Sequence, residues 1–313
     1  MLSVALPNLV HTEVLPRGLA SDKHVFAEKP IGRSLKEARG LQHLAQLGPG
    51  ITGAGFSFRR LPGLAGMRQL VADGALGEIH TARAWYLADY AADPNAALSW
   101  RYSQGKAGPG ALLDIGAHAI DALRFVAGDI TEVSSAILHT QFSERPFPAH
   151  GAIGHAASTS DVRGPVTNDD IALLSLRMTS GAVARVDLSR IATGTPNSLG
   201  LELYGTEGHA RFDSMASGEF HLYTSGAAPT AANGARRVIV GPEHAYFRDV
   251  AAMPGAGVGT GYAEAFTAEI QQFLRCVAEG RPMDTGFAEA TRMMEVVDAA
   301  LSSARSKAPV PVG

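Results

Sequence analysis

The first 58 residues alternate between short apolar runs and helical patterns, and this alternation constrains the fold more than any other feature. The first run ends in Pro7-Asn8, a turn signal typical of the end of a buried parallel strand. Strands that alternate with helices at this spacing pair parallel through right-handed crossovers. The elements expected are strands at Ser3–Leu6, His24–Ala27 and Ile51–Phe58 and helices at Leu9–Ser21 and Ser34–Leu47.

After Arg60 the pattern changes to apolar runs with a period of two, joined by short turns such as Gly205–Gly208. This pattern predicts a mostly antiparallel sheet. One helix is expected from about Ala111 to Ala127, and two more end the chain. We therefore expect part of a doubly wound α/β domain in residues 1–58. Residues 59–313 should form an α+β domain on a large, open sheet.

Composition excludes several classes of function. A formal net charge of −3 over 313 residues gives no electrostatic reason to expect nucleic acid or an anionic membrane as a partner. No stretch reaches the ~18–20 apolar residues of a membrane span, and Met1–Pro7 does not resemble a signal peptide. The single cysteine, Cys276, suits a reducing cytoplasm, where we expect the protein. We interpret Cys276 as core filler and Arg59-Arg60 as solvated surface residues.

Asp114 and His118 are four residues apart, and Asp121 follows three residues later, so the three share one face of the expected helix. A carboxylate beside an imidazole fixes its tautomer and stabilises its protonated form, as a general base requires. The same spacing also suits a purely structural hydrogen bond between His118 and Asp114.

Lys29 follows a buried strand and precedes Pro30, which puts its ammonium at the carboxyl end of the parallel sheet. Ligands of open α/β folds bind at this edge. A lysine there can stabilise the oxygen of an alcohol that loses its proton. The alternative is a surface ion pair between Lys29 and Glu28.

The sequence predicts no metal site, because its eleven histidines include no HxxxH pattern and none is paired with a cysteine. The glycine-rich stretch Gly255–Gly261 has the wrong spacing for a phosphate-binding loop and no strand before it. We expect a flexible loop there.

Five motifs in a fixed order cover nearly the whole chain. They are Pro7-Asn8-x-x-His11, Glu28-Lys29-Pro30, Ser99-Trp100-Arg101, Gly110-x-x-x-Asp114-x-Gly116-x-His118-x-x-Asp121 and Gly261-Tyr262-x-x-x-Phe266. Together they resemble the glucose-fructose oxidoreductase, inositol dehydrogenase and rhizopine catabolism (Gfo/Idh/MocA) family of NAD(P)-dependent oxidoreductases.

The resemblance implies a role for each motif. Lys29 would stabilise the alkoxide, His118 would accept the hydroxyl proton, and Asp114 would orient His118. The residues that would contact the cofactor are Pro7, Asn8, His11, Glu28, Lys29, Trp100, Arg101 and Tyr262.

The implied activity is hydride transfer between a secondary alcohol of a cyclic polyol or sugar and NAD or NADP. Pro62–Ala127 looks most like the branch that acts on inositols and anhydro-sugars such as levoglucosan. The alternative is a truncated, catalytically inactive relative that serves as a sugar-binding or oligomerisation module. A homodimer or homotetramer is expected, because Leu174, Leu201 and Leu203 would lie on a surface that one chain does not fully cover.

The sequence departs from the family pattern in two places. The family begins with a strand and a GxGxxG turn, and by comparison about 65–75 residues of such a half-domain are missing before Met1. Without that turn we expect this chain to bind nicotinamide cofactors poorly and to aggregate. Ser57 also stands where relatives usually have asparagine, which weakens one cofactor contact.

Overall fold

The structure is a computed structural model and describes residues 1–149, 158–226 and 232–313. Its first 55 residues form the parallel sheet that their alternation predicts. The strands pair in the order β1-β2-β3, all parallel. The helix after β2 begins beyond Ser34, whose hydroxyl caps it by accepting a hydrogen bond from the Glu37 amide at 3.3 Å. The elements are β1 (Leu2–Val4), α1 (Asn8–Leu19), β2 (Val25–Glu28), α2 (Leu35–Leu47) and β3 (Thr52–Gly55).

The rest of the described chain is built on a large sheet, which confirms the expected fold class. Its order is β13-β12-β11-β10-β4-β9-β8-β5-β14, and neighbours run antiparallel except for the parallel pair β4 and β9. A separate hairpin joins β6 and β7. The strands are β4 (Ile79–Ala88), β5 (Ile130–His139), β6 (Glu144–Pro148), β7 (Thr159–Pro165), β8 (Ile171–Met178), β9 (Val183–Ser189), β10 (Asn197–Gly205), β11 (Gly208–Asp213), β12 (Glu219–Thr224), β13 (Arg236–Ile239) and β14 (Val310–Pro311).

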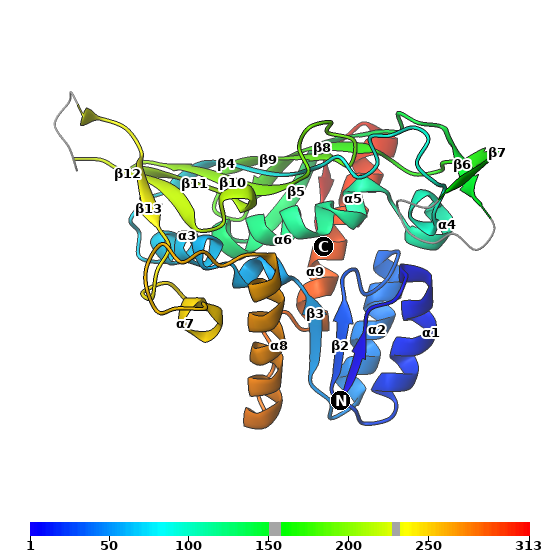
Figure 1. Cartoon of the computed structure of the whole chain (residues 1–313), viewed down its shortest axis with the longest axis horizontal. Helices are drawn as coiled ribbons and strands as arrows, with labels where there is room; N and C mark the ends of the chain where they lie inside the picture. Colours follow the sequence, from blue (N-terminus) through cyan, green and yellow to red (C-terminus); the bar gives the residue numbers. More distant parts are fainter. Residues whose placement is uncertain (150–157, 227–231) are drawn as a thin grey trace.

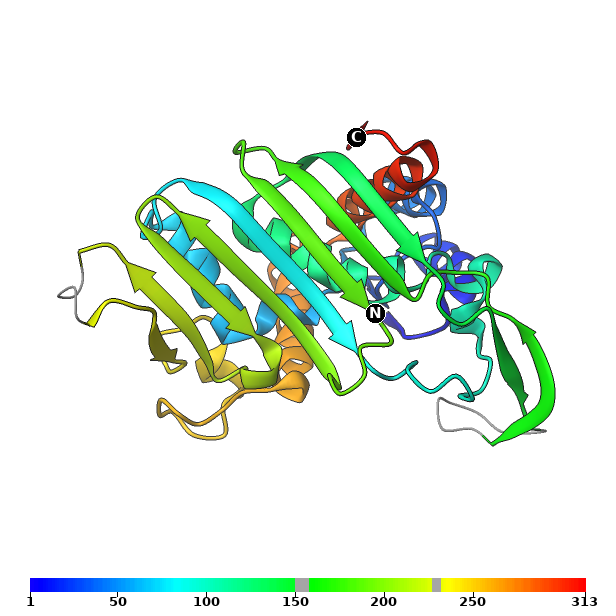
Figure 2. The same ribbon diagram turned by 90° about the horizontal axis from the view of Figure 1, so that it is seen from above.

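Helices cover one face of this sheet, and the other face is bare. α3 (Pro62–Ala72) and α6 (Gly116–Ala127) lie under it in Figure 1, and Figure 2 shows the opposite face without helices. Leu174, Leu201 and Leu203 are at most 2% exposed, so the expectation that they lie on an uncovered surface is wrong. Alternation fixes which residues share a face, but the helices decide which face is covered. The bare face instead carries Ile137, 61% exposed, and Leu173, 42% exposed.

The helix expected over Ala111–Ala127 is broken into two. α5 (Ala111–Asp114) ends at Asp114, and α6 starts at Gly116 after the intervening Ile115. A Cβ atom at Gly116 would lie 2.6 Å from Cδ1 of Leu188 on β9, so the chain packs closely on the sheet at this break. The break falls between the two polar residues that the sequence placed on one face, although Ile115 itself keeps right-handed helical dihedral angles (φ −99°, ψ −30°).

The C-terminal helices connect the two sheets. α8 (Tyr262–Glu279) packs on the small sheet through Phe273, whose ring centroid lies 5.4 Å from that of Phe26. Cys276 is buried in the same cluster, which confirms it as core filler. α9 (Phe287–Ser306) contacts both α2 and β5.

The remaining short helices are η1 (Ser57–Arg60), η2 (Trp100–Tyr102), α4 (Gln104–Ala107), η3 (Ser214–Ala216) and α7 (Phe247–Val250), and residues 255–261 form a loop. Within the described ranges, no helix is both long and apolar enough to cross a membrane. The same residues contain no cluster of three or more His, Cys, Asp or Glu side chains that could hold a metal ion.

Candidate active site

Lys29 leaves the end of β2 and reaches across to the large-sheet domain. Its Nζ donates a short hydrogen bond to the main-chain oxygen of Asp114 and lies 3.5 Å from Oδ1 of the same residue. The Lys29 side chain is only 12% exposed. The expected position at the carboxyl end of the parallel sheet therefore places an ammonium group where the two domains meet. The alternative of a surface pair with Glu28 does not describe this contact.

Asp114 is held from three sides at the last residue of α5. Tyr90 donates its hydroxyl to Oδ2 at 2.9 Å, and Nε of Arg101 lies 3.9 Å from the same oxygen. Burial by itself raises the pKa of Asp114, but the positive charges of Lys29 and Arg101 outweigh it and leave the pKa below the ordinary value. Asp114 is therefore a carboxylate at neutral pH, paired with Lys29.

His118 lies in the first turns of α6 among aromatic rings. Its ring centroid is 5.0 Å from that of Phe58 and 5.9 Å from that of Tyr86. Its Nδ1 is buried and has no hydrogen-bond partner among the described residues. Burial, reinforced by the charge of Lys29, places the pKa of His118 well below its usual 6.5. The imidazole is thus neutral at pH 7, the state that a general base needs.

The expected hydrogen bond between Asp114 and His118 is not formed. The carboxylate of Asp114 turns to Lys29 and Tyr90, because the chain breaks at Ile115 before the helix that carries His118 begins. What orients the imidazole in this structure is the packing of Phe58 and Tyr86.

Asp121, the third polar residue of the stripe, belongs to a buried ion-pair network. Nε of Arg59 donates to its Oδ2 at 2.7 Å, and Arg59 also pairs with Glu289 at 2.9 Å. Arg60 is 1% exposed and pairs with Asp284 on the other side. The interpretation of Arg59-Arg60 as solvated surface residues is therefore wrong, because carboxylates distant in the sequence compensate both buried charges.

The residues expected to contact the cofactor lie in two groups. Tyr262 begins α8, is 51% exposed, and packs its ring 5.7 Å from that of Phe58, the same ring that contacts His118. Arg101 stacks over Trp100 at 4.6 Å, near Asp114.

The other group lies at the start of α1, just after Pro7. Asn8 donates to the main-chain oxygen of Ala107 at 2.8 Å. His11 is fully buried beneath the Glu28–Pro30 turn, with Nδ1 3.0 Å from the oxygen of Pro30. Nε2 of His11 has no partner in the described part of the chain, and burial lowers the pKa of this ring.

A nicotinamide cofactor fits this donor set. Burial raises the pKa of Glu28, and the charge of the neighbouring Lys29 offsets this effect in part. The half-exposed ring of Tyr262 and the unpartnered nitrogen of His118 lie at the same junction. An aromatic wall suits a flat nicotinamide ring, and an ammonium beside a neutral base suits an alcohol that loses its proton.

Two family models match the chain. Residues 1–55 match the oxidoreductase family with an NAD-binding Rossmann fold, and residues 64–211 match the Gfo/Idh/MocA C-terminal domain. Levoglucosan dehydrogenase of Pseudarthrobacter phenanthrenivorans is 33% identical over 315 residues, across 100% of this chain and 80% of its own length. The chain belongs to the Gfo/Idh/MocA family. The resemblance read from the five motifs is thereby confirmed.

Solved structures of this oxidoreductase family superpose closely on the chain. A levoglucosan dehydrogenase complex with NADH and levoglucosan matches with a TM-score of 0.91 and 32% identity, over 99% of this chain and 79% of that one. An oxidoreductase domain protein from Kribbella flavida matches with a TM-score of 0.89 and 34% identity, over 100% of this chain and 80% of that one. Among curated relatives, 1,5-anhydro-D-fructose reductase of Ensifer adhaerens is 30% identical over 159 residues, 51% of this chain and 47% of its own length.

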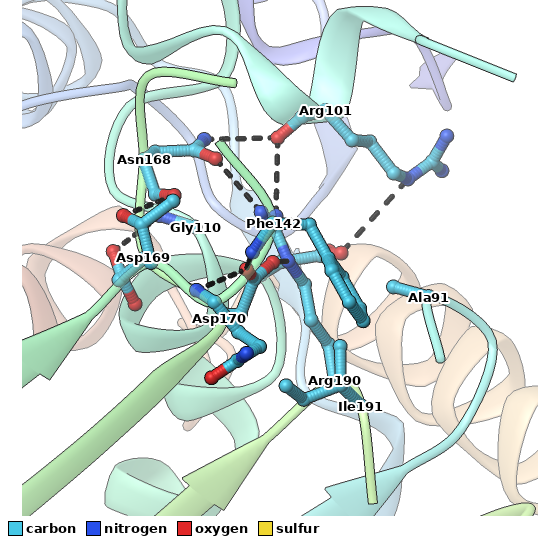
Figure 3. A network of polar contacts seen from close by, with 12 residues as sticks. Ala91, Arg101, Gly110, Phe142, Asn168, Asp169, Asp170, Arg190 and Ile191 are labelled. Atoms are coloured by element: carbon cyan, nitrogen blue, oxygen red, sulfur yellow. Dashed lines mark hydrogen bonds and ion pairs between the residues drawn. The ribbon is translucent and has the colours of Figure 1, made fainter. Parts of the chain in front are cut away.

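Sequence reasoning missed several polar residues next to the site. One of them is Tyr90, which the sequence does not single out because it lies in a loop with no motif around it. A buried network around Arg190 is the other (Figure 3). Its signal was available in the run Asn168-Asp169-Asp170, three polar residues in succession before the apolar strand β8.

Proposed function

We propose that the protein is an NAD-dependent dehydrogenase that oxidises a secondary alcohol of a cyclic sugar or polyol, with anhydro-sugars of the levoglucosan type as the first substrates to test. The observation that carries this proposal is the meeting of Lys29, Asp114 and His118 at the junction of the two sheets. The names of the relatives support the substrate class, since several act on anhydro-sugars or sugars.

The parts of the chain would divide the work. Residues 1–58 would carry the nicotinamide side of the cofactor site, and residues 59–313 the substrate and the contacts between subunits. Pro7, Asn8, Glu28, Trp100, Arg101 and Tyr262 would surround the cofactor, and His11 would act through the Pro30 turn that it supports. The cofactor, when bound, supplies a nicotinamide carbon that accepts the hydride.

The protein's own residues would handle the proton and the charge. The neutral ring of His118 accepts the hydroxyl proton of the substrate, which its depressed pKa allows at neutral pH. The ammonium of Lys29 stabilises the developing alkoxide. We assign Asp114 to holding Lys29, because the carboxylate contacts that ammonium and not the imidazole.

Turnover measured at 340 nm with NAD⁺ and levoglucosan in a full-length version of the protein tests the proposal, with myo-inositol as a second sugar. We expect Lys29→Ala or His118→Ala to lower turnover about 10²–10⁴-fold, the usual contribution of a positioned acid or base. Asp114→Asn should lose less, on the order of tenfold, because Lys29 itself remains. His80→Ala, on an exposed strand position, is the matched control. Near-normal turnover by His118→Ala would show that the base is misassigned, and sugar binding without any turnover would favour a binding module.

We further propose that the bare face of the large sheet pairs with a second copy of the chain. It exposes apolar side chains on adjacent strands, among them Ile137 on β5, Leu173 on β8 and Val183, 49% exposed, on β9. Such a patch on a soluble domain is typical of a subunit contact. Light scattering at micromolar concentration should give the mass of a dimer or tetramer. A monodisperse monomer that persists as the concentration rises tenfold would contradict this.

A further inference from the structure

The segment from Arg101 to Asp114 brings a cation and a carboxylate to the active site, and it is fastened by side chains outside that site. Asn168 is 4% exposed and donates its side-chain amide to two main-chain oxygens, that of Arg101 at 2.9 Å and that of Gly108 at 3.0 Å. The two bonds tie both ends of the turn formed by η2 and α4 to one side chain, and Figure 3 shows the one to Arg101.

Asp169 fastens the start of α5. Its carboxylate accepts hydrogen bonds from the amides of Gly110 at 2.7 Å and Leu112 at 2.8 Å, and its main-chain oxygen accepts one from Ala111 at 2.9 Å. A Cβ atom at Gly110 would lie 1.9 Å from that oxygen, so the two backbones touch here. Three consecutive amides of this turn are thus bound to one residue, and Asp114 follows two residues later.

The anchor for both residues is a buried ion pair. Arg190 and Asp170 are fully buried, and Nε of Arg190 lies 2.8 Å from Oδ1 of Asp170. Arg190 also donates to Oδ1 of Asn168 at 3.0 Å, which fixes which way the Asn168 amide points. The bond from Arg190 therefore fixes the orientation of the Asn168 amide, with its two N–H groups directed at residues 101–108.

The nucleotide-binding side holds the same segment from the opposite direction. Asn8 binds the oxygen of Ala107 at 2.8 Å, and Nη1 of Arg33 binds that of Gly105 at 2.6 Å. The segment is therefore fixed between the domain that carries Lys29 and the loop before β8 that carries Asn168. Its last residue is Asp114, whose main-chain and side-chain oxygens both meet Lys29.

We propose that Asn168 and Asp169 are positioning residues that set Asp114 against Lys29. They touch neither Lys29 nor the reacting atoms, and they act through the backbone of residues 101–114. The proposal rests on the proposed function only for its effect on turnover, since the contact between Lys29 and Asp114 can be measured without a substrate.

Asn168→Asp is the sharpest test, because it keeps the shape and the acceptor for Arg190 but replaces the amide nitrogen and its two N–H donors by one carboxylate oxygen, which faces the carbonyls of Arg101 and Gly108. Loss of two hydrogen bonds corresponds to roughly a 5- to 100-fold change in the opening equilibrium of the segment. Lys29 then loses its partner and becomes accessible to reagents.

The first readout is the rate at which an amine-reactive acylating agent modifies Lys29, followed by peptide mass spectrometry on the full chain. We expect at least about a fivefold rise in Asn168→Asp, with faster amide exchange in residues 101–114. Asn95→Asp is the matched control, because it adds the same charge in a neighbouring loop while its side-chain oxygen still accepts from Arg163. An unchanged Lys29 rate, with faster exchange confined to the sheet, would overturn the proposal.

The second readout is steady-state kinetics with levoglucosan and NAD⁺. We expect kcat to fall about tenfold or more while KM for NAD⁺ stays within about twofold, since chemistry and not cofactor binding is disturbed. A change in KM alone would also overturn the proposal. If the unaltered protein turns over no sugar, the proposed function fails, and the acylation rate still decides this inference.

Asp169→Asn serves where Asn168→Asp does not fold, as judged by circular dichroism. The amide keeps one acceptor oxygen and loses the other, so either Gly110 or Leu112 loses its partner. Acylation of Lys29 should again be faster than in the unaltered protein, but by a smaller factor than in Asn168→Asp. Its absence in a folded Asp169→Asn protein counts against the proposal in the same way.

Discussion

Glu269 offers the clearest test of the electrostatics of this fold. It lies on α8 and is fully buried, and no cationic side chain of the described residues is in hydrogen-bond contact with its carboxyl group. Burial raises its pKa well above the ordinary 4.5, and the opposing charge of Arg60 does not compensate. The folded protein therefore keeps a proton that the unfolded chain releases.

The sign of the effect follows from that proton. Above about pH 4.5 the unfolded chain holds fewer protons at Glu269 than the folded chain, so folding stability falls as pH rises towards the folded pKa. One full proton corresponds to about 1.4 kcal/mol of unfolding free energy per pH unit. Glu269→Gln has the same shape and no proton to lose. The difference in unfolding free energy, variant minus original, should therefore increase by up to about 1.4 kcal/mol per unit above about pH 5.5.

Urea unfolding, followed by the fluorescence of the two tryptophans, measures this difference at about pH 5.5, 6.5 and 7.5, with a linear extrapolation at each pH. All other titratable groups are common to the two proteins, so their contributions cancel in the difference. Glu13→Gln, at an exposed position of α1, is the control and should show no such slope. A difference between Glu269→Gln and the original protein that stays constant with pH would refute the reasoning. A Glu269→Gln variant whose unfolding free energy falls relative to that of the original protein as the pH rises would also refute it.

Two further outcomes follow from the site and its supports. Because burial and Lys29 hold the pKa of His118 well below 6.5, the base form persists into acid, and the acid limb of kcat against pH should lie below 6.5; a limb above that value would show that another group titrates. Arg59→Met should cost about 3–5 kcal/mol in urea unfolding, because it leaves the buried carboxylate of Asp121 without its cation. Removing one partner of a buried ion pair is costly because the other charge stays buried without compensation. A loss of unfolding free energy below about 1 kcal/mol would therefore contradict this account of Arg59 and Asp121.

The position of Lys29 could be predicted from the sequence because its causes are local. A short apolar run, a proline after the lysine and a capped helix that follows at Ser34 together specify a strand end in a parallel sheet. The alternation of β8 to β11 was equally local and predicted the antiparallel pairs.

The burial of Arg59 and Arg60 could not be predicted, because their partners lie far along the chain. Asp121 is 62 residues from Arg59, and Asp284 is 224 residues from Arg60. Two adjacent arginines look the same in sequence whether they are solvated or compensated, and only the packing of α8 and α9 onto η1 decides between the two. Glu269 was missed for the same reason, since an amphipathic helix normally exposes its glutamates.

The role of Asp114 depends on a single backbone event that no helical spacing reveals. Residues four apart meet on one face only while the helix continues, and here it stops at Asp114 and resumes at Gly116. The carboxylate of Asp114 therefore contacts Lys29, which belongs to the other domain, and not His118. The charge that was expected to stabilise an imidazolium instead fixes an ammonium across the domain junction. His118 is left neutral among aromatic rings, and in the proposed reaction it would accept the substrate's proton and become a second cation near Lys29. Burial and the charge of Lys29 disfavour the protonated imidazole, so the proposed base would release its proton readily.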